Sequence, residues 1–150
     1  MGSTNGSTRT ILLVEDNPDD ALFAKRAFSK ICPHASLAVA RDGEAAINYL
    51  AGSGEFQDRS RHPLPSLVLL DLKIPRKSGL EVLEWMRSVP SLQAMPVVVL
   101  SSSNQPRDMD RAHELGVVSY HVKPVTNEAF MEMARSICQI WEELARNPSA

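Results

Sequence analysis

The chain has 150 residues, of which 43% are hydrophobic and 23% charged, and its formal net charge is −2. This length suits one domain of an ordinary globular protein, and the near-neutral charge gives no reason to expect nucleic-acid binding. Because no apolar stretch approaches the roughly 18 residues of a membrane span, and the N-terminus lacks a signal-peptide pattern, we expect a cytoplasmic protein without a membrane segment.

The sequence also allows predictions about the bounds of the folded domain and the state of the two cysteines. Residues 1–9 begin with a Gly-, Ser-, Thr- and Asn-rich stretch, so we predict a disordered tail, with the folded domain at residues 10–146. Cys32 and Cys138 lack the spacing of a metal site. In a cytoplasmic protein we expect them to be reduced thiols rather than a disulfide.

Five segments predict strands. The runs 11–14, 66–70 and 96–100 are almost wholly apolar and do not alternate with polar residues, which is typical of strands buried on both faces of a parallel sheet. Two shorter candidates cover residues 36–40 and 117–122.

A helical segment follows each predicted strand. Asn17 and Pro18 are suited to cap and begin the first, and Gly52 and Gly116 are placed to end the second and fourth. The predicted helices cover residues 18–31, 43–51, 78–88, 106–115 and 127–145. Five strand–helix pairs predict an α/β, flavodoxin-like doubly wound (βα)5 fold, whose five-stranded parallel sheet has the order 2-1-3-4-5.

Residues 52–65 form an unusually long polar connection. A partner-binding excursion and a tolerated surface insertion both fit it.

Acidic residues stand at the carboxyl ends of the first and third predicted strands. Glu15 and Asp16 follow the first, and Asp71 follows the third. In open α/β sheets ligands bind at this edge, where the strand order reverses. Three carboxylates can stay ionised together only beside a cation, and hard oxygen ligands suit Mg²⁺. Taken alone, Asp71 also fits a residue that merely starts a turn.

Two further residues complete a phosphate-binding pattern. Ser101 ends the fourth strand and offers a hydroxyl, and Lys123 follows the fifth and offers an ammonium. Acids, a hydroxyl and a lysine at one sheet edge favour phosphoryl transfer, which depends mainly on positioning and charge neutralisation.

An ordered set of motifs now identifies a family. The motifs are Val14-Glu15-Asp16, Leu70-Asp71, Pro75 with Gly79-Leu80, Leu100-Ser101, Gly116, Tyr120 and Lys123-Pro124. Over residues 10–145 the sequence resembles the receiver domain of two-component response regulators. The 16–20 acidic segment, the 52–65 connection and the Lys-Pro-Val motif resemble, more narrowly, single-domain regulators paired with bacterial phytochrome kinases.

The resemblance implies roles for the acids. Asp71 is expected to be the phosphoacceptor. Mg²⁺ is expected to be held by Glu15, Asp16, Asp71 and the backbone carbonyl of Lys73. From the residues themselves, Asp19 and Asp20 fit the positive end of a helix dipole better than a metal site.

It also implies roles for the C-terminal half. Ser101 and Lys123 are expected to contact phosphoryl oxygens, and Tyr120 to change rotamer together with Ser101. Lys123 and Pro124 are expected to be joined by a cis peptide bond. Ser101 as a plain strand-end hydroxyl and Tyr120 as a fixed core aromatic remain alternatives.

The function expected from this resemblance is signalling. A sensor histidine kinase, in the narrower resemblance a phytochrome, phosphorylates Asp71, and the chain acts by binding a partner or passing the group on, not as an enzyme. The rival is a small Mg²⁺-dependent phosphatase with an aspartyl-phosphate intermediate. Such enzymes need a second acid two residues after the nucleophile, where this chain has Lys73.

The last helix is apolar over about half of its circumference. We predict a homodimer through the face made by helix 106–115, strand 117–122 and helix 127–145. In this prediction Met131 and Cys138 lie on one exposed flank, and Met133 and Ile140 on the other. The alternative is that neighbouring helices cover both flanks.

Overall fold

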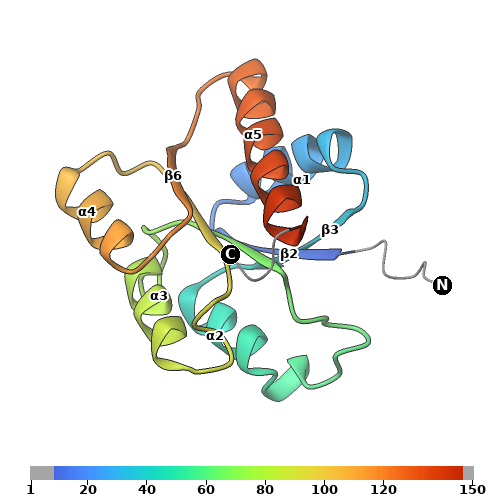
Figure 1. Ribbon diagram of the computed structural model, residues 1–150, viewed down its shortest axis with the longest axis vertical. Coiled ribbons are helices and arrows are strands. Elements are labelled where there is room, and N and C mark those ends of the chain that lie inside the picture. The colour runs from blue at the N-terminus through green and yellow to red at the C-terminus, as the bar shows by residue number, and fades with distance from the viewer. Residues whose placement is uncertain (1–8, 147–150) are drawn as a thin grey trace.

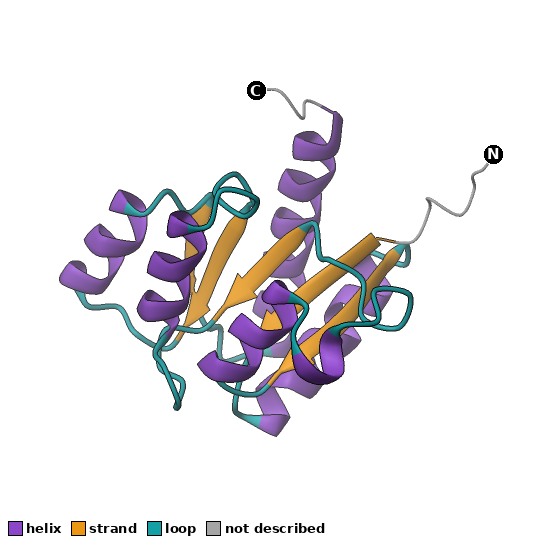
Figure 2. Ribbon diagram, turned by 90° about the horizontal axis from the view of Figure 1, so that it is seen from below, coloured by secondary structure: helices purple, strands orange, loops and turns teal. Residues whose placement is uncertain are grey.

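The computed structural model describes residues 9–146 and contains one five-stranded parallel sheet (Figures 1 and 2). Its strands are β2 (Arg9–Val14), β3 (Ala35–Ala40), β4 (Leu67–Leu70), β5 (Val97–Ser101) and β6 (Ser119–Val122). They lie in the order β3-β2-β4-β5-β6, and every neighbouring pair is parallel. The predicted order 2-1-3-4-5 is therefore confirmed.

Helices cover both faces of this sheet (Figure 1). They are α1 (Pro18–Ile31), α2 (Gly43–Ala51), α3 (Gly79–Ser88), α4 (Pro106–Glu114) and α5 (Asn127–Arg146), with a short 3-10 helix, η1 (Gly54–Phe56). Helices α1 and α5 pack on one face, and α2, α3 and α4 lie on the other side. None of the described helices is long and apolar enough to cross a membrane.

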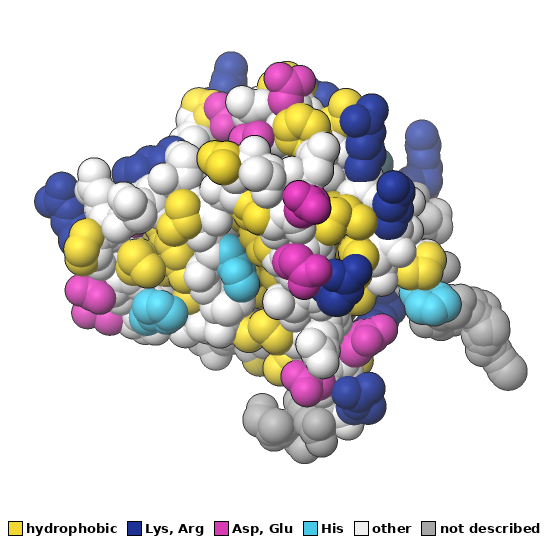
Figure 3. Space-filling view, turned by 90° about the horizontal axis from the view of Figure 1, so that it is seen from above, with side chains coloured by type: hydrophobic (Ala, Val, Ile, Leu, Met, Phe, Trp, Pro, Cys, Tyr) yellow, Lys and Arg dark blue, Asp and Glu magenta, His cyan; other side chains and the backbone are white. Residues whose placement is uncertain are grey.

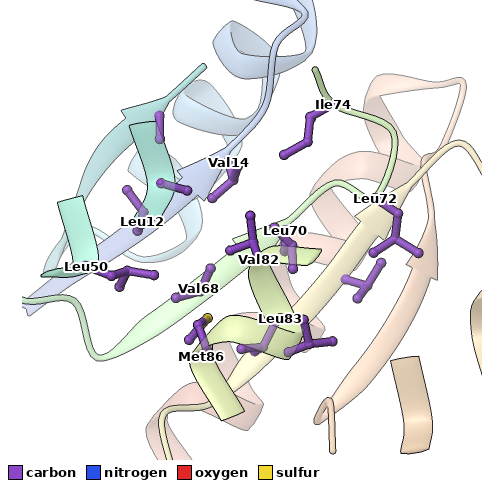
Figure 4. Close-up of a cluster of buried hydrophobic side chains, with 14 of the residues drawn as sticks. Leu12, Val14, Leu50, Val68, Leu70, Leu72, Ile74, Val82, Leu83 and Met86 are labelled. Carbon is purple, nitrogen blue, oxygen red and sulfur yellow. The ribbon is translucent and has the colours of Figure 1, made fainter. Parts of the chain in front are cut away.

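The core follows from the two-residue period of the strands. Leu12 and Leu70 point into the cluster shared with α2 and α3 (Figure 4), whereas Leu13 and Leu69 point into the cluster shared with α1 and α5. Strands β2 and β4 therefore bury both faces, as their unbroken apolar runs predict. The polar residues that follow them are left at the carboxyl edge.

Capping side chains set the helix starts next to that edge. The Asn17 side chain accepts hydrogen bonds from the backbone N–H groups of Asp19 and Asp20, which begins α1 directly after the acids of β2. Ser78 and Glu81 form a capping box that begins α3. A side chain at Gly79 would collide with the main chain of Asp71, so this glycine lets α3 begin close against the end of β4.

The long connection after α2 is tied down by one arginine. The Arg59 guanidinium donates hydrogen bonds to the carbonyls of Tyr49 at 2.8 Å, Leu50 at 3.0 Å and His62 at 3.1 Å. The aromatic rings of Tyr49, Phe56 and His62 pack against one another in the same region. The segment therefore follows a defined path against the end of α2.

The expectation of reduced thiols is wrong. Cys32, which ends α1, and Cys138 in α5 form a disulfide across 106 residues of sequence. The sequence spacing of the two cysteines does not predict this pair, because only the packing of α1 against α5 brings them together.

The predicted tail covers residues 1–9. Residues 1–8 lie outside the described residues, and Arg9 begins β2.

The predicted exposed flanks of the last helix are largely covered. Met133 and Cys138 are buried, and Met131 and Ile140 are partly buried. The reason is that α1 packs along α5 and takes up much of its apolar surface. Figure 3 shows this side of the molecule, where hydrophobic side chains lie among acidic and basic ones.

Candidate phosphoryl-transfer site

The carboxyl edge of the sheet brings three acids together. Glu15 follows β2 and Asp71 follows β4, and both are buried, whereas Asp16 is exposed. Each offers a carboxylate oxygen, and these three oxygens lie within 4.8 Å of one another. The sequence prediction that these residues meet at the point where the strand order reverses is thus fulfilled by the geometry.

A lysine from the opposite end of the sequence neutralises part of this charge. The Nζ atom of Lys123 lies 2.7 Å from Glu15 Oε1, 2.8 Å from Asp20 Oδ2 and 2.9 Å from Asp71 Oδ2. Burial lowers the pKa of Lys123, but the hydrogen bonds to these carboxylates outweigh it and raise the pKa above its usual value. The ammonium is therefore held in its charged form.

The three carboxylates that contact Lys123, together with the nearby Asp16, leave the site acidic. Burial raises the pKa of Glu15, while the hydrogen bonds from Lys123 and from the Asn17 backbone N–H oppose that rise. The oxygen-only donor set and the surplus negative charge fit a small divalent cation such as Mg²⁺. The Lys73 backbone N–H donates to Asp71 Oδ1 at 3.0 Å, which brings the main chain of residue 73 to the same place.

The hydroxyl expected at the end of β5 also lies at Asp71. Ser101 Oγ donates a hydrogen bond to Asp71 Oδ1 at 2.9 Å, and Ser101 is fully buried. The Tyr120 hydroxyl donates a hydrogen bond to the backbone carbonyl of Ser103 at 2.8 Å. Ser103 in turn donates its backbone N–H to Ser101 Oγ at 3.2 Å, so Tyr120 and Ser101 are linked through one residue.

The structure corrects the expected cis peptide bond. The described residues contain no cis peptide, so Lys123 and Pro124 are joined in the trans form. An X–Pro bond prefers trans by about 0.5–1 kcal/mol, so proline permits the cis form without requiring it.

Sequence reasoning did not find three residues of this region. The sequence predicts a helix-dipole role for Asp20, yet this residue contacts Lys123 across 103 residues of sequence. No sequence pattern points to Ser103 or Asp108, yet both are buried and they are hydrogen-bonded to each other at 2.7 Å. The signal that could have pointed to Asp20 is its place in the first turn after the Asn17 cap, facing the sheet edge.

Known proteins are similar to this chain in sequence and in structure. The sequence profile of the response regulator receiver domain matches residues 11–135. The response regulator Rcp1 of Synechocystis is 33% identical over all 150 residues and over its own full length. A probable methanogenesis regulatory protein, FilR2 of Methanothrix harundinacea, is 37% identical over 92% of this chain and 86% of its own.

Solved structures agree with the sequence matches. The phosphorylated cyanobacterial phytochrome response regulator RcpA superposes with a TM-score of 0.82 at 34% identity, covering 89% of this chain and 94% of that one. The bacteriophytochrome response regulator AtBRR superposes with a TM-score of 0.73 at 40% identity, with the same coverage. This chain therefore belongs to the response regulator receiver domain family of two-component signalling.

Proposed function

We propose that Asp71 accepts a phosphoryl group from the phosphohistidine of a sensor histidine kinase. A carboxylate oxygen of Asp71 attacks phosphorus, the phosphorus–nitrogen bond breaks, and the imidazole leaves. The observation that carries this proposal is the convergence of Ser101 and Lys123 on the two carboxylate oxygens of Asp71, at 2.9 Å each. In this proposal both groups contact oxygens of the transferred phosphoryl group.

We further propose Mg²⁺ as the cofactor of this step. The acids Glu15, Asp16 and Asp71 form the donor set, and the backbone carbonyl of Lys73 is proposed to join them. When bound, the metal neutralises charge that develops on the phosphoryl oxygens. An Mn²⁺-bound form of the similar regulator Rcp1 is known, which supports a divalent cation in this family.

The proposed partner is a bacterial phytochrome kinase in the cytoplasm. The support is likeness: RcpA is described as a phytochrome response regulator and AtBRR as a bacteriophytochrome response regulator. The rival phosphatase is less well supported, because the position two residues after Asp71 holds Lys73 rather than an acid. We therefore propose a signalling protein whose own chemistry is limited to gaining and losing its phosphoryl group.

The experiment is labelling with acetyl phosphate and Mg²⁺, read by intact-protein mass spectrometry. Wild type is expected to gain one phosphoryl group, and Asp71→Asn none. Asp19→Asn removes an exposed carboxylate from the same edge and serves as the matched control. Equal labelling of Asp71→Asn and wild type would overturn the assignment, and continuous phosphate release at many turnovers would favour the phosphatase.

We also propose a homodimer through the face made by α4, β6 and α5. Strand β6 is an edge of the sheet, Val118 and Val122 are 39% and 46% exposed, and Leu144 of α5 lines a surface hollow together with Val118. Ile140 lies one helical turn before Leu144 on the same side. These residues give the face made by α4, β6 and α5 a modest apolar strip, which supports self-association there.

Sedimentation velocity with and without acetyl phosphate tests the dimer. Val122→Glu is expected to keep the protein monomeric, whereas Leu64→Glu, an equally exposed position in the 52–65 connection, should associate like wild type. A wild type that is monomeric at tens of micromolar in both states would rule the dimer out.

A further inference from the structure

One buried carboxylate, that of Asp108, takes no part in the proposed phosphoryl transfer. Among the described residues, the buried carboxylates are Glu15, Asp71 and Asp108, and the first two belong to the proposed phosphorylation site. Asp108 lies in the first turn of α4. A buried carboxylate is costly unless it is paired and hydrogen-bonded, so its partners show what holds this end of the helix.

Two groups satisfy Asp108. Ser103 Oγ donates to Asp108 Oδ2 at 2.7 Å, and Lys73 Nζ forms an ion pair with the same oxygen at 3.2 Å. The Ser103 hydrogen bond, together with the Lys73 charge, lowers the pKa of Asp108 despite its burial. Lys73 belongs to the loop between β4 and α3, so this ion pair joins the start of α4 to that loop.

Both partners of Asp108 also touch the phosphorylation site. The Lys73 backbone N–H donates to Asp71 Oδ1 at 3.0 Å. The Ser103 backbone N–H donates to the Ser101 hydroxyl, which itself donates to Asp71 Oδ1. Asp108 is thus linked to Asp71 through Lys73 on one route. On the other route it is linked through Ser103 and then Ser101, although it lies on a different element.

The electrostatics of this arrangement change when Asp71 carries a phosphoryl group. A protein-bound phosphoryl group adds a charge of about −1.5 to −2 and three acceptor oxygens. The Lys73 side chain is 56% exposed and flexible, so it is free to turn toward the new charge next to its own backbone. Asp108, whose side chain is 12% exposed, would then be a buried carboxylate without its cation.

We propose that the Lys73–Asp108 ion pair is a latch that fastens the first turn of α4 to the β4–α3 loop, and that a phosphoryl group on Asp71 opens it by competing for the Lys73 ammonium. Release of Lys73 favours movement of Asp108 toward water, which loosens the start of α4. This inference rests on the proposed phosphorylation of Asp71 and adds a specific route by which that event reaches a helix.

Amide hydrogen exchange of residues 106–115, measured by mass spectrometry, tests the latch. In wild type, phosphorylation is expected to speed exchange of this segment. Before phosphorylation, this segment of Lys73→Met is expected to exchange about fivefold faster than in wild type, because a half-exposed ion pair is lost. After phosphorylation, exchange in this variant should not increase further. Lys77→Met removes an exposed lysine from the same loop and should behave like wild type.

A second pair of variants tests the partner. Asp108→Asn keeps an acceptor for Ser103 but removes the buried charge, so phosphorylation should change exchange of α4 less than in wild type. Asp110→Asn, an exposed acid on the same helix, is the matched control. The double variant Lys73→Met/Asp108→Asn should exchange more slowly than Lys73→Met, because no uncompensated charge remains.

The labelled fraction, measured on the same samples, separates two kinds of failure. If wild type gains no phosphoryl group, the proposed function fails. If wild type is labelled but exchange of residues 106–115 is unchanged, or if Lys73→Met exchanges like wild type before labelling, the latch is overturned.

Discussion

Lys123 holds three carboxylates at distances of 2.7 to 2.9 Å, and it is 14% exposed. Its presence at the sheet edge could be predicted from its place after the fifth strand. The contact with Asp20 could not, because it joins residues 103 apart and depends on how α1 lies over the sheet edge. The burial of Asp108 could not be predicted either, because it results from the packing of α4 and not from the polar sequence around this residue.

Lys123→Met is expected to lower the free energy of unfolding by about 3 kcal/mol without Mg²⁺, since it leaves Glu15 and Asp71 buried without a cation. Urea unfolding measures the loss. Mg²⁺ should stabilise this variant more than wild type, because the metal then supplies the missing charge. Lys25→Met removes an exposed lysine of α1 and should change little. A variant as stable as wild type in EDTA would contradict the prediction.

Asp16→Ala is expected to weaken Mg²⁺ binding at least about tenfold, because it removes one of three carboxylates from the donor set. It should also raise stability in EDTA slightly, by relieving repulsion among the acids. Isothermal titration of Mg²⁺ measures the affinity, with Asp19→Ala as the control. Equal affinity in wild type and Asp16→Ala would remove Asp16 from the metal site.

At the scale of elements, α3 is fastened at its C-terminal end by one side chain. The Arg87 guanidinium donates hydrogen bonds to the carbonyls of Leu115 at 2.7 Å, Gln93 at 2.9 Å, Met95 at 3.1 Å and Gly116 at 3.3 Å. Burial lowers the pKa of Arg87. This fork ties α3 to the end of α4 and to the loop before β5.

Arg87→Met is expected to cost about 2–4 kcal/mol, because several carbonyls lose a charged donor at once. The urea midpoint should fall without a change in slope. Arg26→Met, at an exposed position of α1, is the matched control. If both variants unfold at the wild-type midpoint, the fork contributes nothing to stability.

The elements themselves were largely predictable, and their boundaries less so. Apolar runs identified β2, β4 and β5, and the Asn17 cap fixed the start of α1. Helix α3 begins at Gly79 rather than at residue 78, because Ser78 is its N-cap. Strand β6 begins at Ser119 rather than at residue 117, and the 3-10 turn Gly54–Phe56 was not foreseen. Such short features depend on neighbouring segments, which a periodicity argument does not include.

At the scale of the molecule, the Cys32–Cys138 disulfide clamps α1 to α5. Reduction is expected to lower the free energy of unfolding by about 2–4 kcal/mol, since the bond closes a long loop in the unfolded chain. Unfolding with and without dithiothreitol measures this. The Cys32→Ser/Cys138→Ser variant should not respond to the reductant. Two reactive thiols in the unreduced native protein would contradict the bond.

The same bond divides the candidate phosphoryl-transfer site between a covalent ring and an arm. Residues 32–138 form the ring, which carries Asp71, Ser101 and Lys123, while Glu15, Asp16 and Asp20 lie on the N-terminal arm outside it. A protease cut within residues 53–65 would open the ring without detaching Asp71 from the segment that carries Glu15 and Asp16. The two fragments would stay covalently joined until the disulfide is reduced.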